Sequence, residues 1–133
     1  MKQSKKETVI NYRREIDTLT NGVRRWLGKE FEQPTKDQIM TYTENLFFDE
    51  LKIQGFSTES MQMIINAAYT RASNKYGILT ELIDDVSVNE IMVNGPEWIY
   101  VERNHRIEPV DDAFTSEAEL EEIMGQSLFL CDL

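Results

Sequence analysis

The sequence is poor in cysteine and in long apolar runs, and each of these shortages excludes a class of structural feature. Its single cysteine, Cys131, excludes an internal disulfide and a cysteine-based metal cluster. No stretch approaches the roughly 20 apolar residues that a membrane-spanning helix needs. Lys2, Lys5 and Lys6 are not followed by the apolar stretch of a signal peptide. We therefore expect a cytoplasmic chain.

Charge is distributed unevenly along the 133 residues. Residues 1–29 contain 8 Lys and Arg against 3 Asp and Glu, a net of +5, whereas residues 30–133 contain 6 against 21, a net of −15. The acidic body argues against nucleic acid as the main ligand, because phosphate groups repel it. The basic head, with Arg24 and Arg25, is either the solvated face of a helix or a contact for anionic lipid or an acidic partner.

The first third of the chain has the spacing of an amphipathic helix. Apolar residues from Val9 to Trp26 recur alternately every three and four positions. This pattern predicts one continuous helix over about 7–27, with Gly28 as its end. Fewer than three heptads are present, so packing against neighbouring helices is favoured over a coiled coil.

Two further helices are predicted by their first residues. Thr35 followed by Gln38 is a capping box, in which each side chain bonds the backbone N–H of the other. Ser57 or Thr58 begins a third apolar stripe, which we expect to close at Gly77. The apolar faces of these helices are typical of core packing.

Residues 90–103, EIMVNGPEWIYVER, have the pattern of a β-hairpin. Two short runs of apolar and β-branched residues, 91–93 and 99–101, suit a pleated surface. The residues that separate the runs are Asn94, Gly95 and Pro96. Asn and Gly tolerate positive φ and Pro has no N–H to donate, so these three residues predict a turn.

A third strand and a closing helix are predicted after the hairpin. Asn104 and His105 suit a second tight turn, from which residues 106–110 return as a strand. Ser116 and Glu119 have the spacing of a capping box and predict the start of a helix.

The same stretch, with residues 79–89 before it and 105–120 after it, resembles the N-terminal region of CpaF/TadA-type ATPases. These are the traffic ATPases of pilus assembly and of type II and type IV secretion. The resemblance is close from Gly77 to about Met124. It implies a non-catalytic module that sits on the ATPase core of a ring-shaped hexamer, contacts neighbouring subunits and connects nucleotide-driven motion to inner-membrane platform proteins.

The resemblance also implies that ATP and Mg²⁺ belong to an ATPase domain that these 133 residues do not contain. The phosphate-binding loop of such a domain has the pattern G-x-x-x-x-G-K-[ST]. The nearest match has five residues between Gly22 and Gly28, and it has Glu30 in place of the hydroxyl residue. We expect no ATP hydrolysis by this chain alone, and we assign it no catalytic, cofactor-binding or metal-binding residue.

Isolated chemical groups do not change this expectation. The acidic pairs at 84–85 and 111–112 lack the spacing of a calcium loop and are expected at exposed ends of elements. His105 has no nucleophile near it in sequence, and Cys131 has no base. The strand glutamates lack an aromatic platform for sugar chemistry. They are Glu90, Glu102 and Glu108.

The best functional candidates lie on the predicted second strand. Alternation places Ile99 and Val101 towards the core, and Tyr100 and Glu102 towards a helix, a subunit or solvent. Arg103 pairs either with Glu108 or with an acid of a partner. The full set of candidate interface residues is Glu90, Asn94, Gly95, Pro96, Tyr100, Glu102, Arg103, Arg24 and Arg25.

We therefore predict an α+β fold. A lead of about three helices over 1–76 precedes the front half of the family's N-terminal α/β domain over 77–126, with an antiparallel three-stranded meander and a closing helix. An irregular tail, 127–133, follows.

Three other readings stay open beside the ATPase module. The chain is alternatively a stand-alone interaction or regulatory protein that binds the parent ATPase through an open sheet edge. A small-ligand sensor is the second alternative, with a pocket lined by Trp98, Tyr100 and Phe114. The weakest is peripheral contact of the basic head with the inner face of the membrane.

Overall fold

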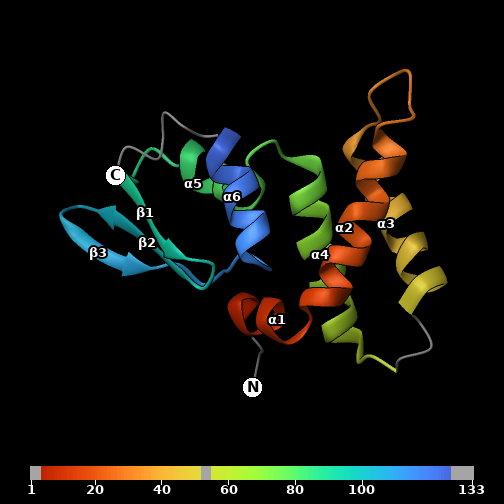
Figure 1. Ribbon diagram of the computed structural model, residues 1–133, viewed down its shortest axis with the longest axis horizontal. Coiled ribbons are helices and arrows are strands. Elements are labelled where there is room, and N and C mark those ends of the chain that lie inside the picture. Colours follow the sequence, from red (N-terminus) through yellow and green to blue (C-terminus); the bar gives the residue numbers. More distant parts are fainter. Residues whose placement is uncertain (1–3, 52–54, 127–133) are drawn as a thin grey trace.

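The computed structural model describes residues 4–51 and 55–126, and the fold is α+β, as the sequence predicts. The helices are α1 (Lys5–Asn11), α2 (Arg13–Leu27), α3 (Lys36–Leu51), α4 (Thr58–Ser73), the 3₁₀ turn η2 (Gly77–Leu79), α5 (Thr80–Asp84) and α6 (Glu117–Gln126). The strands are β1 (Glu90–Gly95), β2 (Trp98–Arg103) and β3 (Arg106–Pro109). Figure 1 shows the sheet at one end of the molecule, α2, α3 and α4 at the other, and α5 and α6 between them.

The predicted helix over 7–27 is not continuous. Tyr12 leaves the helical conformation, with φ −125° and ψ 35°, and separates α1 from α2. Its ring packs edge-on against Phe56 at a centroid distance of 5.5 Å, and its hydroxyl lies 3.5 Å from the hydroxyl of Ser60. These contacts are between segments far apart in sequence, so the periodicity of the stripe gave no sign of the break.

The start signals of the next two helices are confirmed. Gln38 Oε1 accepts from Thr35 N at 2.8 Å, and Thr35 Oγ1 accepts from Gln38 N at 3.1 Å, which completes the capping box. Ser57 caps α4 by accepting from Ser60 N at 3.1 Å. The predicted stop was placed too late, because α4 ends at Ser73 and Gly77 instead opens η2 with φ +51°.

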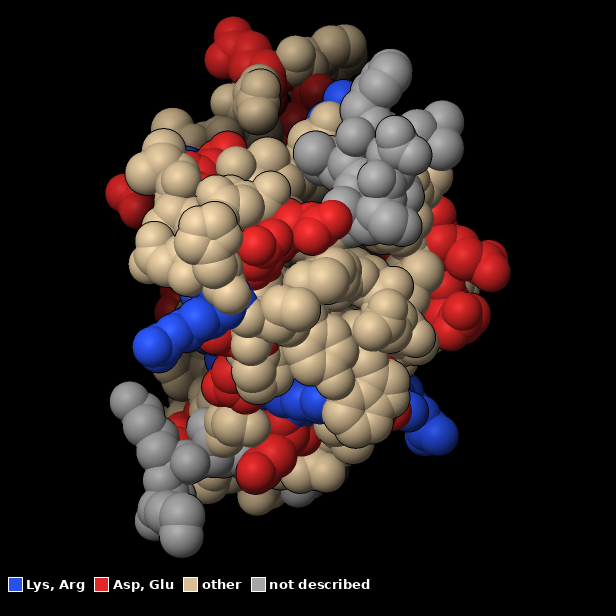
Figure 2. Space-filling view, turned by 90° about the vertical axis from the view of Figure 1, so that its left-hand side faces the viewer, with Lys and Arg blue, Asp and Glu red and all other residues tan. Residues whose placement is uncertain are grey.

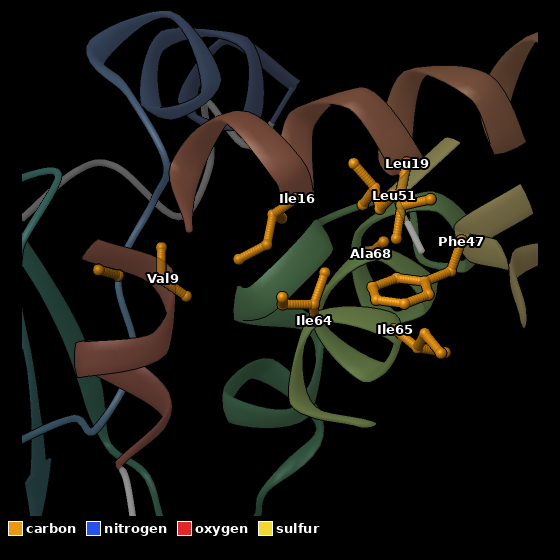
Figure 3. Packing of buried hydrophobic residues seen from close by; sticks show 9 residues of the cluster. Val9, Ile16, Leu19, Phe47, Leu51, Ile64, Ile65 and Ala68 are labelled. Carbon is orange, nitrogen blue, oxygen red and sulfur yellow. The ribbon is translucent and has the colours of Figure 1, made fainter. Parts of the chain in front are cut away.

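Buried apolar side chains form two clusters. The helical core lies between α1, α2, α3 and α4, and Figure 3 shows most of its members pointing towards one another. It consists of Val9, Ile16, Leu19, Phe47, Leu51, Ile64, Ile65, Ala68 and Ala113. The strand core lies between the sheet, η2 and α6. It consists of Ile78, Leu79, Ile99, Phe114 and Ile123.

The sheet is the predicted antiparallel meander, in the order β1-β2-β3. Asn104 and His105 make the β2–β3 turn with φ of 50° and 64°, which confirms the prediction of a left-handed turn. Ile99 and Val101 are 2% and 1% exposed, so they face the core as expected.

Gly22, the first glycine of the segment 22–30 that partly matches the phosphate-binding loop pattern, is explained by helix packing. Gly22 lies inside α2, and a Cβ there would come within 2.4 Å of Leu46 Cδ2. The residue therefore lets α2 and α3 approach closely. Within 4–51 and 55–126, none of the helices combines the length and the apolar character needed to cross a membrane. Cys131 and the predicted tail lie outside the described residues.

Candidate functional site: the outer strand face

The strand register divides the sheet into an inner and an outer face. The inner face packs on the strand core through Ile91, Val93 and Ile99. Directly opposed residues lie on the same face of a sheet. The pairs Met92↔Tyr100, Glu102↔Ile107 and Tyr100↔Pro109 therefore identify the residues on the opposite, outer face. We call this set the outer strand face. It consists of Glu90, Met92, Trp98, Tyr100, Glu102, Ile107 and Pro109.

Large apolar side chains are exposed on the outer strand face. Trp98 is 55% exposed and Ile107 is 66% exposed. Lys6 Nζ lies 4.2 Å from the centre of the Trp98 ring, a cation–π contact from α1. Figure 2 views the side of the molecule on which the strands lie, and uncharged side chains gather at its centre with both acidic and basic groups around them. Exposed aromatic area of this kind, rimmed by polar groups, marks interaction surfaces.

Two carboxylates oppose each other on this face. Glu90 is directly opposite Glu102 across β1 and β2. The Cβ atoms of two residues paired in this way lie about 5 Å apart, so two side chains of like charge are neighbours. Across the described ranges, neither carboxylate has a Lys or Arg within ion-pair distance. Like charges in this position destabilise a sheet. A cation supplied from outside would relieve the repulsion.

Arg103 forms the ion pair with Glu108 that was one of the two alternatives, and it also contacts Asp85 and Ser87. Its guanidinium bonds Asp85 at 2.9 Å and Glu108 at 3.2 Å, and Nε donates to Ser87 Oγ at 3.1 Å. Hydrogen bonds from Ser87 and then from Arg103 lower the pKa of Asp85 to about 2. Sequence reasoning found Glu108 and missed Asp85, which directly follows α5 and lies outside the strands.

The β1–β2 turn residues shape the hairpin. Gly95 has φ +156°, a conformation that residues with a Cβ rarely adopt. Pro96 O accepts from Phe114 N at 2.8 Å, which ties the turn to the segment before α6. Asn94 is exposed beside them. Glu97, in the same turn, forms an ion pair with Arg13 of α2.

The basic candidates lie on α2, not on the sheet. Arg24 is 3.4 Å from Glu122 of α6, and it also reaches the backbone oxygen of Arg71 at 3.5 Å. Arg25 is exposed. The structure therefore does not bring the two arginines together with Tyr100 and Glu102 in one surface.

The predicted exposure of the acidic pairs is only partly correct. Asp84 and Asp111 are exposed, whereas Asp85 and Asp112 are half-buried. Asp111 also accepts from the backbone N–H groups of Lys5 and Lys6 at 3.2 Å each and so caps α1. Asp112 is half-buried, and burial raises its pKa. In the described part of the chain, no group of three or more His, Cys, Asp or Glu is placed to hold a metal ion.

The aromatic pocket expected for a sensor does not form. Phe114 is fully buried in the strand core, on the inner side of the sheet, whereas Trp98 lies on the outer strand face. The two rings therefore cannot line one pocket. A cavity exists elsewhere, between α1, α4 and α5.

A buried charged pair was missed by sequence reasoning. Arg71 of α4 is 2% exposed, and its Nε lies 3.0 Å from Glu119 Oε2. Glu119 was expected to reach back to Ser116 N. Its Oε1 instead accepts from Thr115 N at 2.8 Å. Only the other half of the predicted capping box forms, in which Glu119 N donates to Ser116 Oγ at 3.1 Å. The spacing of Ile64, Ala68 and Arg71 on one helical face was the available signal.

Comparison with known proteins adds no relative. No family model matches the chain, and no match was found among curated proteins.

Proposed function

We propose that this chain is a non-catalytic interaction module of the kind that precedes the ATPase core in CpaF/TadA-type secretion ATPases. The resemblance of residues 77–124 to that region supports the proposal. The structural observation that carries it is the outer strand face, where exposed Ile107 lies opposite Glu102, exposed Trp98 lies at the other end of β2, and Glu90 and Glu102 have no ion-pair partner among the described residues. ATP and Mg²⁺ belong to the partner, not to this chain.

The chemistry of the surface defines the partner segment. Apolar side chains of the partner cover Trp98 and Ile107, because burying aromatic area supplies most of the affinity of such contacts. A Lys or Arg next to them meets Glu90 and Glu102, which removes their mutual repulsion. We infer that this segment belongs to the ATPase core or to a neighbouring subunit of the ring, with inner-membrane platform proteins as the next partners of the assembly.

A binding experiment tests this proposal. The probe is a purified, full-length ATPase of this type from the same cell, and the measurement is its equilibrium dissociation constant with the 133-residue chain. We expect saturable binding that weakens at least tenfold for Glu90→Gln/Glu102→Gln and for Trp98→Ala. Each change removes an expected contact while leaving the inner face intact.

A matched double variant controls for net charge. Glu50→Gln/Glu121→Gln removes the same two charges from exposed positions on α3 and α6, and its affinity is expected to equal that of the unchanged chain. Equal weakening by both double variants assigns the effect to long-range charge and contradicts a specific surface. Absence of binding to the ATPase contradicts the proposed function itself.

A further inference from the structure

A cavity of about 370 Å³ lies away from the outer strand face, where α1, α4 and α5 meet the segment before α6. Its volume is near the lower end of the roughly 300–1,000 Å³ found for small-molecule sites. One wall is a contact between α1 and α4, in which Thr8 Oγ1, which donates to Ser4 O at 3.0 Å, lies 3.4 Å from Met63 Sδ. The cavity is therefore built from elements that are far apart in sequence.

The lining has an apolar floor and a charged rim. Val9 and Ile78 are buried at 1% and 8% exposure, and the apolar part also includes Met40 of α3 and Met63 and Ala67 of α4. Lys5 and Glu81 are exposed lining residues, of opposite charge. A ligand for this shape has an apolar body and one polar end.

Asp112 is a half-buried carboxylate in the lining that feels the positive charges of Arg71 and Lys5. One of its oxygens accepts from Ala113 N at 2.8 Å. Among the described residues, no Lys or Arg lies within ion-pair distance of Asp112. A half-buried carboxylate with one backbone bond retains capacity for a charged donor.

Arg71 is near Asp112 but is held by other groups. Its Nη1 donates to Ala67 O at 3.1 Å, its Nη2 donates to Ala113 O at 2.7 Å, and its Nε faces Glu119. The guanidinium therefore cannot turn towards Asp112 without breaking three buried contacts. With the charge of Arg71 balanced by Glu119, the remaining charged lining residues are Lys5, Glu81 and Asp112, a net of −1.

We propose that this cavity binds a small primary amine, whose ammonium group pairs with the Asp112 carboxylate and whose apolar body lies on Met63 and Ile78. The proposal does not depend on the proposed interaction with an ATPase. It assigns the chain a small-ligand site separate from the outer strand face.

The test compares three probes of the same size and shape on the unchanged chain. They are 2-phenylethylamine, 2-phenylethanol and phenylacetate, which place a cation, a neutral hydroxyl and an anion at the same position. The readout is the NMR shift of the Met63 methyl group during titration. We expect saturable binding of the amine, at least tenfold weaker binding of the alcohol, and no binding of the acid.

Variants then assign the amine to Asp112. Asp112→Asn is expected to weaken amine binding at least tenfold, whereas Asp111→Asn, the same change at the neighbouring residue that caps α1, leaves it unchanged. Ala67→Leu fills the cavity and is expected to abolish binding of all probes. Equal affinity for amine and alcohol overturns the proposal, as does amine binding that survives Asp112→Asn or the absence of any Met63 shift. The probe comparison needs no variant, so a folding defect of Asp112→Asn leaves the test intact.

Discussion

Arg71 and Glu119 form a buried ion pair that connects α4 of the helical core to α6 of the strand core. Their side chains are 1% and 9% exposed, and Arg71 Nε lies 3.0 Å from Glu119 Oε2. The N–H of Nε is not aligned for a hydrogen bond, so the contact is mainly electrostatic. Arg71 Nη1 and Nη2 each donate one hydrogen bond, to the backbone oxygens of Ala67 and Ala113 respectively. The pair thus holds the two halves of the molecule in one arrangement.

Removing one partner of this pair is expected to be more harmful than removing both. Glu119→Ala leaves the guanidinium of Arg71 buried without its counter-charge, which costs about 3–5 kcal/mol of unfolding free energy. The double variant Arg71→Met/Glu119→Leu replaces the pair by apolar groups and is expected to cost less. Urea unfolding followed by circular dichroism measures both. A double variant less stable than Glu119→Ala contradicts this account.

Repulsion between the opposed carboxylates of the outer strand face is expected to lower the unfolding free energy. Glu90→Gln removes the repulsion with Glu102 and is expected to raise the unfolding free energy by about 0.2–1 kcal/mol. The gain should shrink in 1 M NaCl, because salt screens exposed charges. Glu121→Gln, on the exposed side of α6, is the control and should change stability little. A Glu90→Gln variant that is less stable than the unchanged chain, at low salt, rules out the repulsion.

Local signals in the sequence were enough to predict most of the elements. The capping box of Thr35 and Gln38 forms with both bonds, and the turn at Asn104 and His105 has the expected positive φ values. Each of these features depends on residues within four positions of one another. Alternation on β2 likewise predicted which side chains are buried, because a strand has only two faces.

Contacts between segments far apart in sequence could not be predicted from local sequence patterns. The break at Tyr12 depends on Phe56 and Ser60, and the N-terminus of α1 is capped by Asp111 from the other end of the chain. The pairing of Arg71 with Glu119 depends on the packing of α4 against α6. For the candidate site, alternation placed Tyr100 and Glu102 on one face, but the opposition of Glu90 and Glu102 required the strand register.

Acid is expected to remove a contribution to stability that involves Asp85. The pKa of Asp85 is lowered from 3.8 to about 2 by bonds from Ser87 and Arg103. A carboxyl whose pKa is lower in the folded state stabilises the fold at pH values above the unfolded pKa. That stability is lost as pH falls from about 4 through about 2. The unfolding free energy of Asp85→Asn should therefore fall less between pH 6 and pH 2 than that of the unchanged chain.

The control for this pH dependence is the neighbouring acid. Asp84→Asn makes the same change of charge at an exposed residue outside the Arg103 contacts. Its pH profile is expected to follow that of the unchanged chain. A profile of Asp85→Asn that coincides with both would show that the bonds to Ser87 and Arg103 do not persist in solution.

The β2–β3 turn offers a substitution that is expected to stabilise the chain. His105 adopts φ 64°, where a Cβ is unfavourable, and both central turn residues have positive φ. His105→Gly creates Asn-Gly, the sequence preferred in two-residue turns of this type, and is expected to raise the unfolding free energy by about 0.5–1 kcal/mol. His105→Ala is the matched control, because it removes the imidazole and keeps the Cβ. Thermal unfolding measures both, and equal stability of the two variants would show that the positive φ of residue 105 costs nothing.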